Sequence, residues 1–137
     1  MSKLDRPMPS VSLAGDTDGT EILTPHHIPN DSYMKNYLKL PGYTREKGFC
    51  MTMEHDNSFS YKVARHGFTE TYKKGVDYSN LTVTQVLQRQ CQEYLEICKM
   101  DGFSKDELEK IKKELQYLAN DTHNKWPTIF QKITIKD

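Results

Sequence analysis

The chain has 137 residues, of which 36% are hydrophobic, and its 19 basic and 19 acidic side chains give a formal net charge of +0. No stretch approaches the roughly 18 to 20 apolar residues that a bilayer span needs, and the N-terminal region lacks the apolar run of a signal peptide. We therefore expect one modest soluble domain, intracellular and cytoplasmic, that does not bind nucleic acid by bulk charge alone.

Residues 1–31 are predicted to form an extended or disordered arm. Five of the six prolines fall within the first 41 residues, and the large apolar side chains of the arm follow neither a helical nor a strand period. Ordering such a backbone costs roughly 1 to 2 kcal/mol per residue, so we expect the arm to fold along a protein partner. The candidate partner-binding residues are Leu13, Ile22 and Leu23 in the arm, with Tyr33, Tyr37 and Tyr43 where it meets the domain.

Residues 32–137 are predicted to form a single small α+β domain. It begins with a short amphipathic helix over 32–40, which ends at Pro41-Gly42 because this pair cannot continue a helix. Alternating apolar and polar residues then predict strands at 49–54, 59–64 and 68–72, with turn residues between the first two. This strand region, about 49–72, is interpreted as a three-stranded antiparallel meander.

Two amphipathic helices are predicted at about 82–100 and 104–120. Each begins at a capping box, Thr82-x-x-Gln85 and Ser104-x-x-Glu107, and the short link through Gly102 requires an antiparallel αα-hairpin. A β-branched segment at about 128–136 predicts a terminal strand. The expected fold is thus a three-stranded antiparallel meander packed against a C-terminal αα-hairpin, with an extended N-terminal arm.

Charge separates along the chain although the total cancels. Residues 1–31 carry two basic and five acidic side chains, whereas residues 32–75 carry eight basic and four acidic ones together with many aromatic rings. Basic residues interleaved with aromatic ones on a sheet suit single-stranded nucleic acid, and an acidic protein face would suit them equally well. The alternative is that the rings line the core and the lysines are solvated. The residues of this candidate surface, within 59–74, are Tyr61, Lys62, Arg65, Phe68, Lys73 and Lys74.

An enzymatic function rests on one pattern, Cys50 with His55 or His66, because an imidazole can turn a neighbouring thiol into a thiolate. Cys50, Cys91 and Cys98 form an odd set without zinc-site spacing, and the adjacent His26 and His27 are expected to lie in water. We therefore expect no metal and no cofactor.

The main interpretation is a non-enzymatic interaction or structural subunit. It docks on a larger intracellular protein assembly through its N-terminal arm and its aromatic, basic middle segment. The first alternative is a nucleic-acid-binding module that uses the basic aromatic segment 59–74, and the second is a small Cys50-dependent enzyme.

Overall fold

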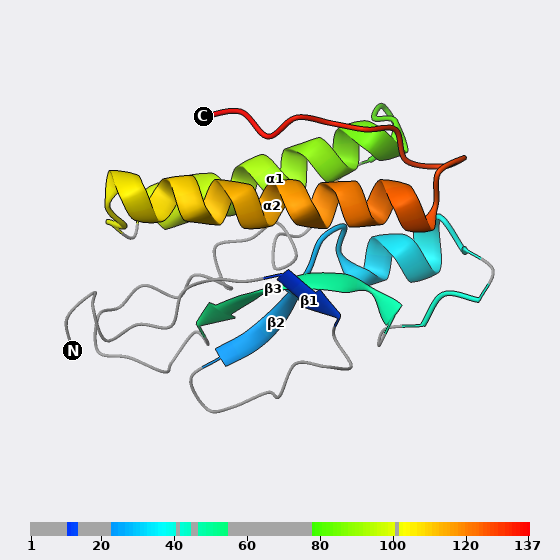
Figure 1. Cartoon of the computed structure of the whole chain (residues 1–137). Helices are drawn as coiled ribbons and strands as arrows, with labels where there is room; N and C mark the ends of the chain where they lie inside the picture. The colour runs from blue at the N-terminus through cyan, green and yellow to red at the C-terminus, as the bar shows by residue number, and fades with distance from the viewer. Residues whose placement is uncertain (1–10, 14–22, 41, 45–46, 55–77, 101) are drawn as a thin grey trace.

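The computed structural model describes residues 11–13, 23–40, 42–44, 47–54, 78–100 and 102–137. Strands β1 (Val11–Leu13), β2 (Leu23–His27) and β3 (Phe49–Glu54) form an antiparallel sheet on one side of helices α1 (Val83–Met100) and α2 (Lys105–Lys125) (Figure 1). A π-helix, η3 (Tyr33–Tyr37), follows β2. The molecule is therefore a small α+β fold in which an antiparallel sheet packs with a C-terminal helix pair, as predicted.

Both helices begin at the predicted capping boxes. At α1, the Thr82 amide donates to Gln85 Oε1 at 2.8 Å and the Gln85 amide donates to Thr82 Oγ1 at 3.1 Å. At α2, Ser104 and Glu107 exchange the same pair of bonds at 2.7 and 3.2 Å. Gly102 separates the two helices with a φ of 81°, a left-handed conformation that an L side chain rarely adopts.

Helix α2 is longer than the sequence predicts. It was expected to end near residue 120, because Asn120-Asp121 is typical of a turn, but it continues to Lys125. Ala119 and Thr122 extend the buried stripe through this last turn, and the Thr122 hydroxyl donates to the Leu118 carbonyl at 2.8 Å. Packing therefore overrides the local preference, and the helix ends where Pro127 follows Trp126.

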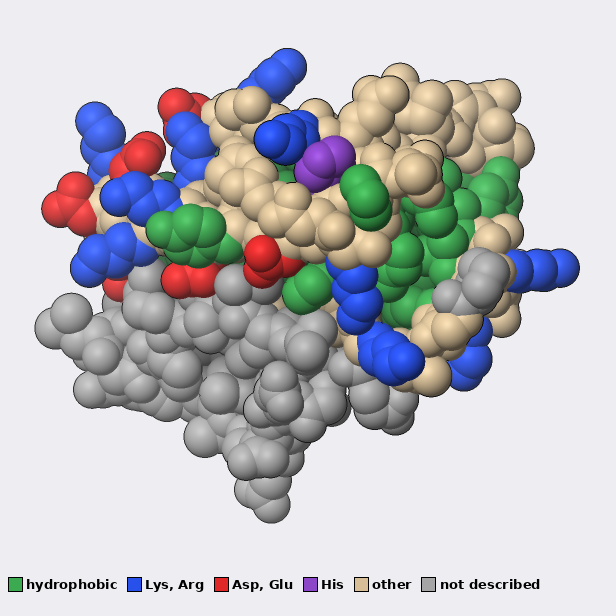
Figure 2. All heavy atoms as spheres, turned by 45° about the vertical axis from the view of Figure 1, so that its right-hand side comes forward, with side chains coloured by type: hydrophobic (Ala, Val, Ile, Leu, Met, Phe, Trp, Pro, Cys, Tyr) green, Lys and Arg blue, Asp and Glu red, His purple; other side chains and the backbone are tan. Residues whose placement is uncertain are grey.

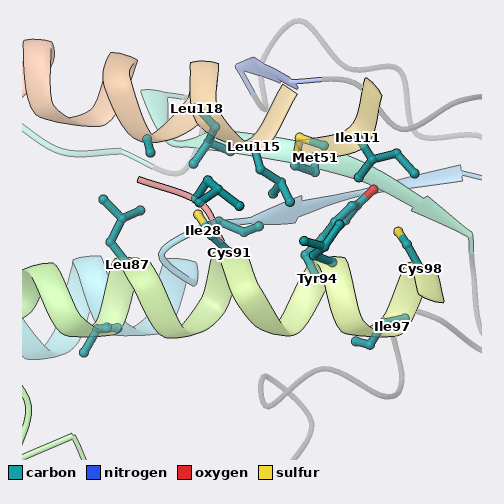
Figure 3. Packing of buried hydrophobic residues seen from close by; sticks show 14 of the residues in the cluster. Ile28, Met51, Leu87, Cys91, Tyr94, Ile97, Cys98, Ile111, Leu115 and Leu118 are labelled. Atoms are coloured by element: carbon teal, nitrogen blue, oxygen red, sulfur yellow. The ribbon is translucent and has the colours of Figure 1, made fainter. Parts of the chain in front are cut away.

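The core lies between the two helices and the sheet. Leu87, Cys91 and Tyr94 of α1 and Ile111, Leu115 and Leu118 of α2 are at most 1% exposed. Ile28 and Met51 come from the sheet side and pack into the same cluster (Figure 3). Most of the apolar helix positions expected from the sequence are buried here, because their spacing of three and four residues places them on one face of each helix.

The predicted strand at 49–54 is confirmed as β3, but its described partners come from the N-terminal segment. The strand order is β1-β3-β2, with Val11 opposite Met51 and His27 opposite Cys50. The expected boundary at residue 31 therefore needs correction, because two strands lie before it and residues 26–30 are buried. The predicted strands at 59–64 and 68–72 lie outside the described residues.

The prediction of a terminal strand at about 128–136 is wrong. Residues 129–137, called the tail from here on, run along α1 and α2 on the side away from the sheet without strand structure (Figure 1). Ile133 and Ile135 do favour an extended backbone, as their β-branched side chains indicate. The main-chain groups of the tail are bonded by helix side chains instead of by a neighbouring strand.

No helix in the described ranges combines the length and the apolar character needed to cross a bilayer.

Candidate interaction surfaces

Tyr33 and Tyr37 of helix η3 form a cluster of three tyrosines with Tyr78, which precedes α1. The Tyr33 and Tyr37 rings stack with centroids 5.1 Å apart, and Tyr78 meets Tyr33 edge-on at 5.0 Å. Tyr33 is only 2% exposed whereas Tyr37 is 53% exposed. Burial, with smaller contributions from Tyr37 and Tyr78, raises the pKa of Tyr33 to about 12. The buried ring therefore supports an exposed one, and the cluster presents Tyr37 to solvent.

A buried amide network fixes the start of η3. The side-chain oxygen Oδ1 of Asn30 accepts from the main-chain amide of Tyr33 at 2.7 Å. The main-chain amide of Asn30 donates to Gln90 Oε1 at 2.8 Å. The Tyr78 hydroxyl accepts from the side chains of both Asn30 and Gln90, at 3.1 and 3.2 Å. Gln90 is 1% exposed, so these bonds compensate for removing its amide from water. They join the segment after β2 to η3 and α1.

A second aromatic surface forms where residues 42–44 and 47–49 meet the end of α2. The Trp126 ring lies 6.3 Å from both Tyr43 and Phe49, and Lys125 Nζ lies 5.1 Å above the Trp126 ring and 5.4 Å above that of Phe49. Lys125 also donates to the Lys47 carbonyl at 3.0 Å. We call these five residues the lysine-rimmed patch.

The patch is both apolar and positively charged. Tyr43, Phe49 and Trp126 are partly buried, which leaves part of each ring in water, and Lys47 and Lys125 are exposed. Figure 2, which brings this end of the molecule forward, shows hydrophobic side chains gathered together with Lys and Arg side chains beside them. Burial, followed by the charge of Lys47, lowers the pKa of Lys125. Two cations are thus crowded next to the exposed rings.

A third surface is the groove that holds the tail, and α1 lines one side of it. The Gln131 amide of the tail donates to Thr84 Oγ1 at 3.1 Å. Gln88 Nε2 donates to the Thr134 carbonyl at 3.2 Å. Gln92 bonds both main-chain groups of Lys136, accepting from its amide at 2.8 Å and donating to its carbonyl at 2.9 Å. The three α1 residues are four apart, so they share one helix face.

Helix α2 lines the other side of the groove. Gln116 Nε2 donates to the Ile133 carbonyl at 2.9 Å, and Gln116 Oε1 accepts from the Ile135 amide at 3.0 Å. His123 Nδ1 lies 2.6 Å from the Phe130 carbonyl, and since a carbonyl only accepts, Nδ1 carries the proton. Lys112 pairs with the Asp137 carboxylate at 2.6 Å. We call this set, Thr84, Gln88, Gln92, Lys112, Gln116 and His123, the tail groove.

The structure places the six predicted partner-binding residues differently from one another. Tyr37 is exposed and Tyr43 half-buried, whereas Tyr33 belongs to the core. The main chains of the two arm residues that are described pair with β3, Leu13 with Phe49 and Leu23 with Glu54. The remaining arm residue, Ile22, lies outside the described residues. The partner-binding role of the six residues stays a prediction, because the side chains of Leu13, Ile22 and Leu23 lie outside what the structure describes.

The residues proposed for nucleic acid lie outside the part of the chain that the structure describes, and so do His55 and His66. Cys50 is fully buried in β3, and His27 is its register partner on the neighbouring strand β2. His26 and His27 are 2% and 6% exposed, so the expectation that they lie in water is wrong, because β2 carries them into the sheet. Within the described ranges no three His, Cys, Asp or Glu side chains are grouped to hold a metal ion.

Comparison of the chain with protein-family models, with curated proteins and with solved structures found no match.

Proposed function

We propose that this protein is a non-enzymatic binding module that docks on a protein partner through the lysine-rimmed patch. The observation that carries the proposal is the contact of Lys125 with the Trp126 and Phe49 rings at a partly exposed surface. Aromatic residues at the centre of a patch, with charged groups at its edge, are typical of surfaces that bind proteins. Tyr37, exposed on the neighbouring helix η3, provides a further aromatic contact.

The partner chemistry that fits the patch is an acidic segment that also carries apolar side chains. Lys125 lies beside Lys47, and burial, followed by the charge of Lys47, lowers the pKa of Lys125. Asp31 is an acid that contacts the patch, and its carboxylate accepts the Tyr43 hydroxyl at 2.8 Å. A carboxylate from a partner would relieve the repulsion between the two lysines, while apolar side chains would cover the exposed part of the rings.

The test is capture of partners from a native extract by the full chain, followed by cross-linking mass spectrometry. The test variant is Lys47→Glu with Lys125→Glu, which reverses the charge of the rim and leaves the rings in place. We expect this variant to lose the proteins that the natural chain captures, and we expect their capture to weaken as salt is raised. Cross-links should map to the patch and to acidic segments of the partner.

The matched control is Lys110→Glu with Lys113→Glu, two exposed lysines on α2 that lie outside the patch. It changes the net charge by the same amount, so it should capture the same proteins as the natural chain. Equal capture by both variants would refute the proposal.

Deletion of residues 1–31 does not test the proposal cleanly, because it removes β1, β2 and the buried Ile28.

Two expectations remain predictions, because their residues fall in 55–77. One is the nucleic-acid surface at 59–74. The other is that further strands at 59–64 and 68–72 complete a meander. Since β3 already has a neighbour on each side, such strands would have to join an outer edge of the sheet or pair with each other.

The full burial of the Cys50 thiol favours a binding module over a thiol enzyme, since a reagent cannot reach it in the folded protein.

A further inference from the structure

We propose that the acid bound by the lysine-rimmed patch is a phosphate group on a tyrosine side chain of the partner. The inference rests on the proposed function, because it concerns the same surface, and it names the group that pairs with Lys47 and Lys125. It is supported by the polar partners of the two lysines, by their closeness to each other, and by the place of Lys125 on the aromatic rings.

The two lysines of the patch are bonded to main-chain carbonyls. Lys125 Nζ donates to the Lys47 carbonyl at 3.0 Å, and Lys47 Nζ donates to the Gly42 carbonyl at 3.4 Å. Neither lysine pairs with a carboxylate in the part of the chain that the structure describes. Asp31, an acid that contacts the patch, instead accepts the Tyr43 hydroxyl at 2.8 Å. An ammonium group has three donors, so each lysine can still bond an anion.

The closeness of the two cations favours an anion with two charges. The charge of Lys47 contributes, after burial, to the lowered pKa of Lys125, so the two ammonium groups repel each other. A carboxylate carries one charge and neutralises one of them. A phosphate monoester carries a charge of about −1.5 to −2 at pH 7 and three acceptor oxygens, so it can pair with both lysines at once.

The aromatic rings favour tyrosine as the residue that carries the phosphate. Lys125 Nζ lies 5.1 Å from the centre of the Trp126 ring and 5.4 Å from that of Phe49, so cation and aromatic surface are within reach of one side chain. Phosphotyrosine has its ring and its phosphate in the same residue. Its ring can pack against the exposed part of Trp126 or Phe49 while its phosphate meets the lysines. A phosphoserine side chain would leave the rings in water.

The experiment follows the fluorescence of Trp126, the single tryptophan of the chain, while phenyl phosphate is added to the natural protein. Phenyl sulfate is the matched ligand, because it has the same ring and a tetrahedral anionic group but carries only one charge. Glycerol 1-phosphate carries the phosphate without a ring. At low salt we expect phenyl phosphate to bind about fivefold more tightly than either, the effect of one additional ion pair at a surface.

The test variant is Lys47→Gln, which removes one cation and keeps the main-chain carbonyl that Lys125 bonds. It should bind phenyl phosphate and phenyl sulfate with equal affinity, because one lysine remains to pair with either anion. The matched control is Lys110→Gln, an exposed lysine on α2 outside the patch, which should keep the preference for phenyl phosphate. Circular dichroism of both variants establishes that they are folded.

Equal affinity of the natural chain for phenyl phosphate and phenyl sulfate would overturn the inference, and so would a preference that persists in Lys47→Gln. Absence of saturable binding of phenyl phosphate would overturn it as well. If glycerol 1-phosphate binds as tightly as phenyl phosphate, the rings play no part, and the patch fits a phosphoserine or a lipid headgroup instead. Loss of partner capture in the Lys47→Glu, Lys125→Glu variant would, in each of the first two cases, leave the proposed function standing with a carboxylate as the acid.

Discussion

The helical hairpin has extended chain on two sides, and the two are attached in different ways. On one side the sheet packs through its apolar residues Ile28 and Met51, and its strands satisfy one another's main-chain groups. On the other side the tail contributes Phe130 and Ile135 to the same core, and glutamines of the helices bond its main chain. Both sides therefore share one core, and they differ in what bonds the main chain of the extended segments: a neighbouring strand on one side and helix side chains on the other. Substitutions on each side distinguish the two kinds of attachment.

The largest effect is expected on the sheet side. Met51→Ala removes a fully buried side chain from the centre of β3 and should lower the free energy of unfolding by about 2 to 5 kcal/mol, measured by urea denaturation. Tyr117→Ala, on α2, removes a side chain that is 55% exposed and should change it by less than about 0.5 kcal/mol. Equal losses would mean that the sheet does not share the core of the hairpin.

A smaller loss is expected on the tail side. Gln116→Ala removes both bonds to the tail main chain, and the free energy of unfolding should fall by about 1 to 2 kcal/mol, since each bond is worth roughly 0.5 to 1.5 kcal/mol. The exposed Glu109→Ala on the same helix serves as the control. A loss as large as that of Met51→Ala would contradict the assignment of two hydrogen bonds as the contribution of Gln116.

Alkaline pH should act on the side of the sheet and η3. Burial raises the pKa of Tyr33 to about 12 from the ordinary value of 10.0, so the folded state keeps the hydroxyl protonated where the unfolded chain ionises. The stabilisation is complete below pH 10 and is lost as pH rises towards 12. Tyr33→Phe should reduce this alkaline loss, measured as the urea midpoint against pH. An identical profile in both proteins would contradict the assignment.

Acid pH should act on the tail, with the smallest effect. The hydrogen bond from Lys112, and then its charge, lowers the pKa of Asp137 below 3.8. A lowered carboxyl pKa contributes stability above the ordinary pKa, and this is lost as pH falls through the folded value. The tail should therefore loosen below about pH 4, seen as a change in the Ile135 resonances. Lys112→Ala should remove this pH dependence, and its persistence would exclude the ion pair as the cause.

Local, periodic features of the fold could be predicted from the sequence. The capping boxes at Thr82 and Ser104 and the apolar stripes of both helices depend only on residues three or four positions apart. The partners of β3 could not be predicted, because the pairing of Val11 with Met51 joins segments far apart in the chain. For the same reason the sequence did not indicate that His26 and His27 are buried, because their burial depends on the pairing of β2 with β3.

The tail groove was missed for a different reason. Ile133 and Ile135 correctly indicate an extended backbone, but no sequence pattern names the groups that will bond it. Gln88 and Gln92 resemble ordinary solvent-facing helix residues, and the one sequence signal of a shared role is their spacing of four, which places both on one face of α1. Among the candidate site residues named from the sequence, Tyr43 belongs to the lysine-rimmed patch, where it is half-buried, and Tyr37 is exposed on η3.

The central claim is that side-chain amides of the helices bond the main chain of the tail, and amide hydrogen exchange of the natural chain and of Gln116→Ala tests it most directly. The account predicts that the Ile135 amide is protected in the natural chain and exchanges about five- to tenfold faster in Gln116→Ala, while the amides of β3 are unchanged. Exchange of the Ile135 amide at the rate of an unstructured peptide in the natural chain, or equal protection in both proteins, would contradict it.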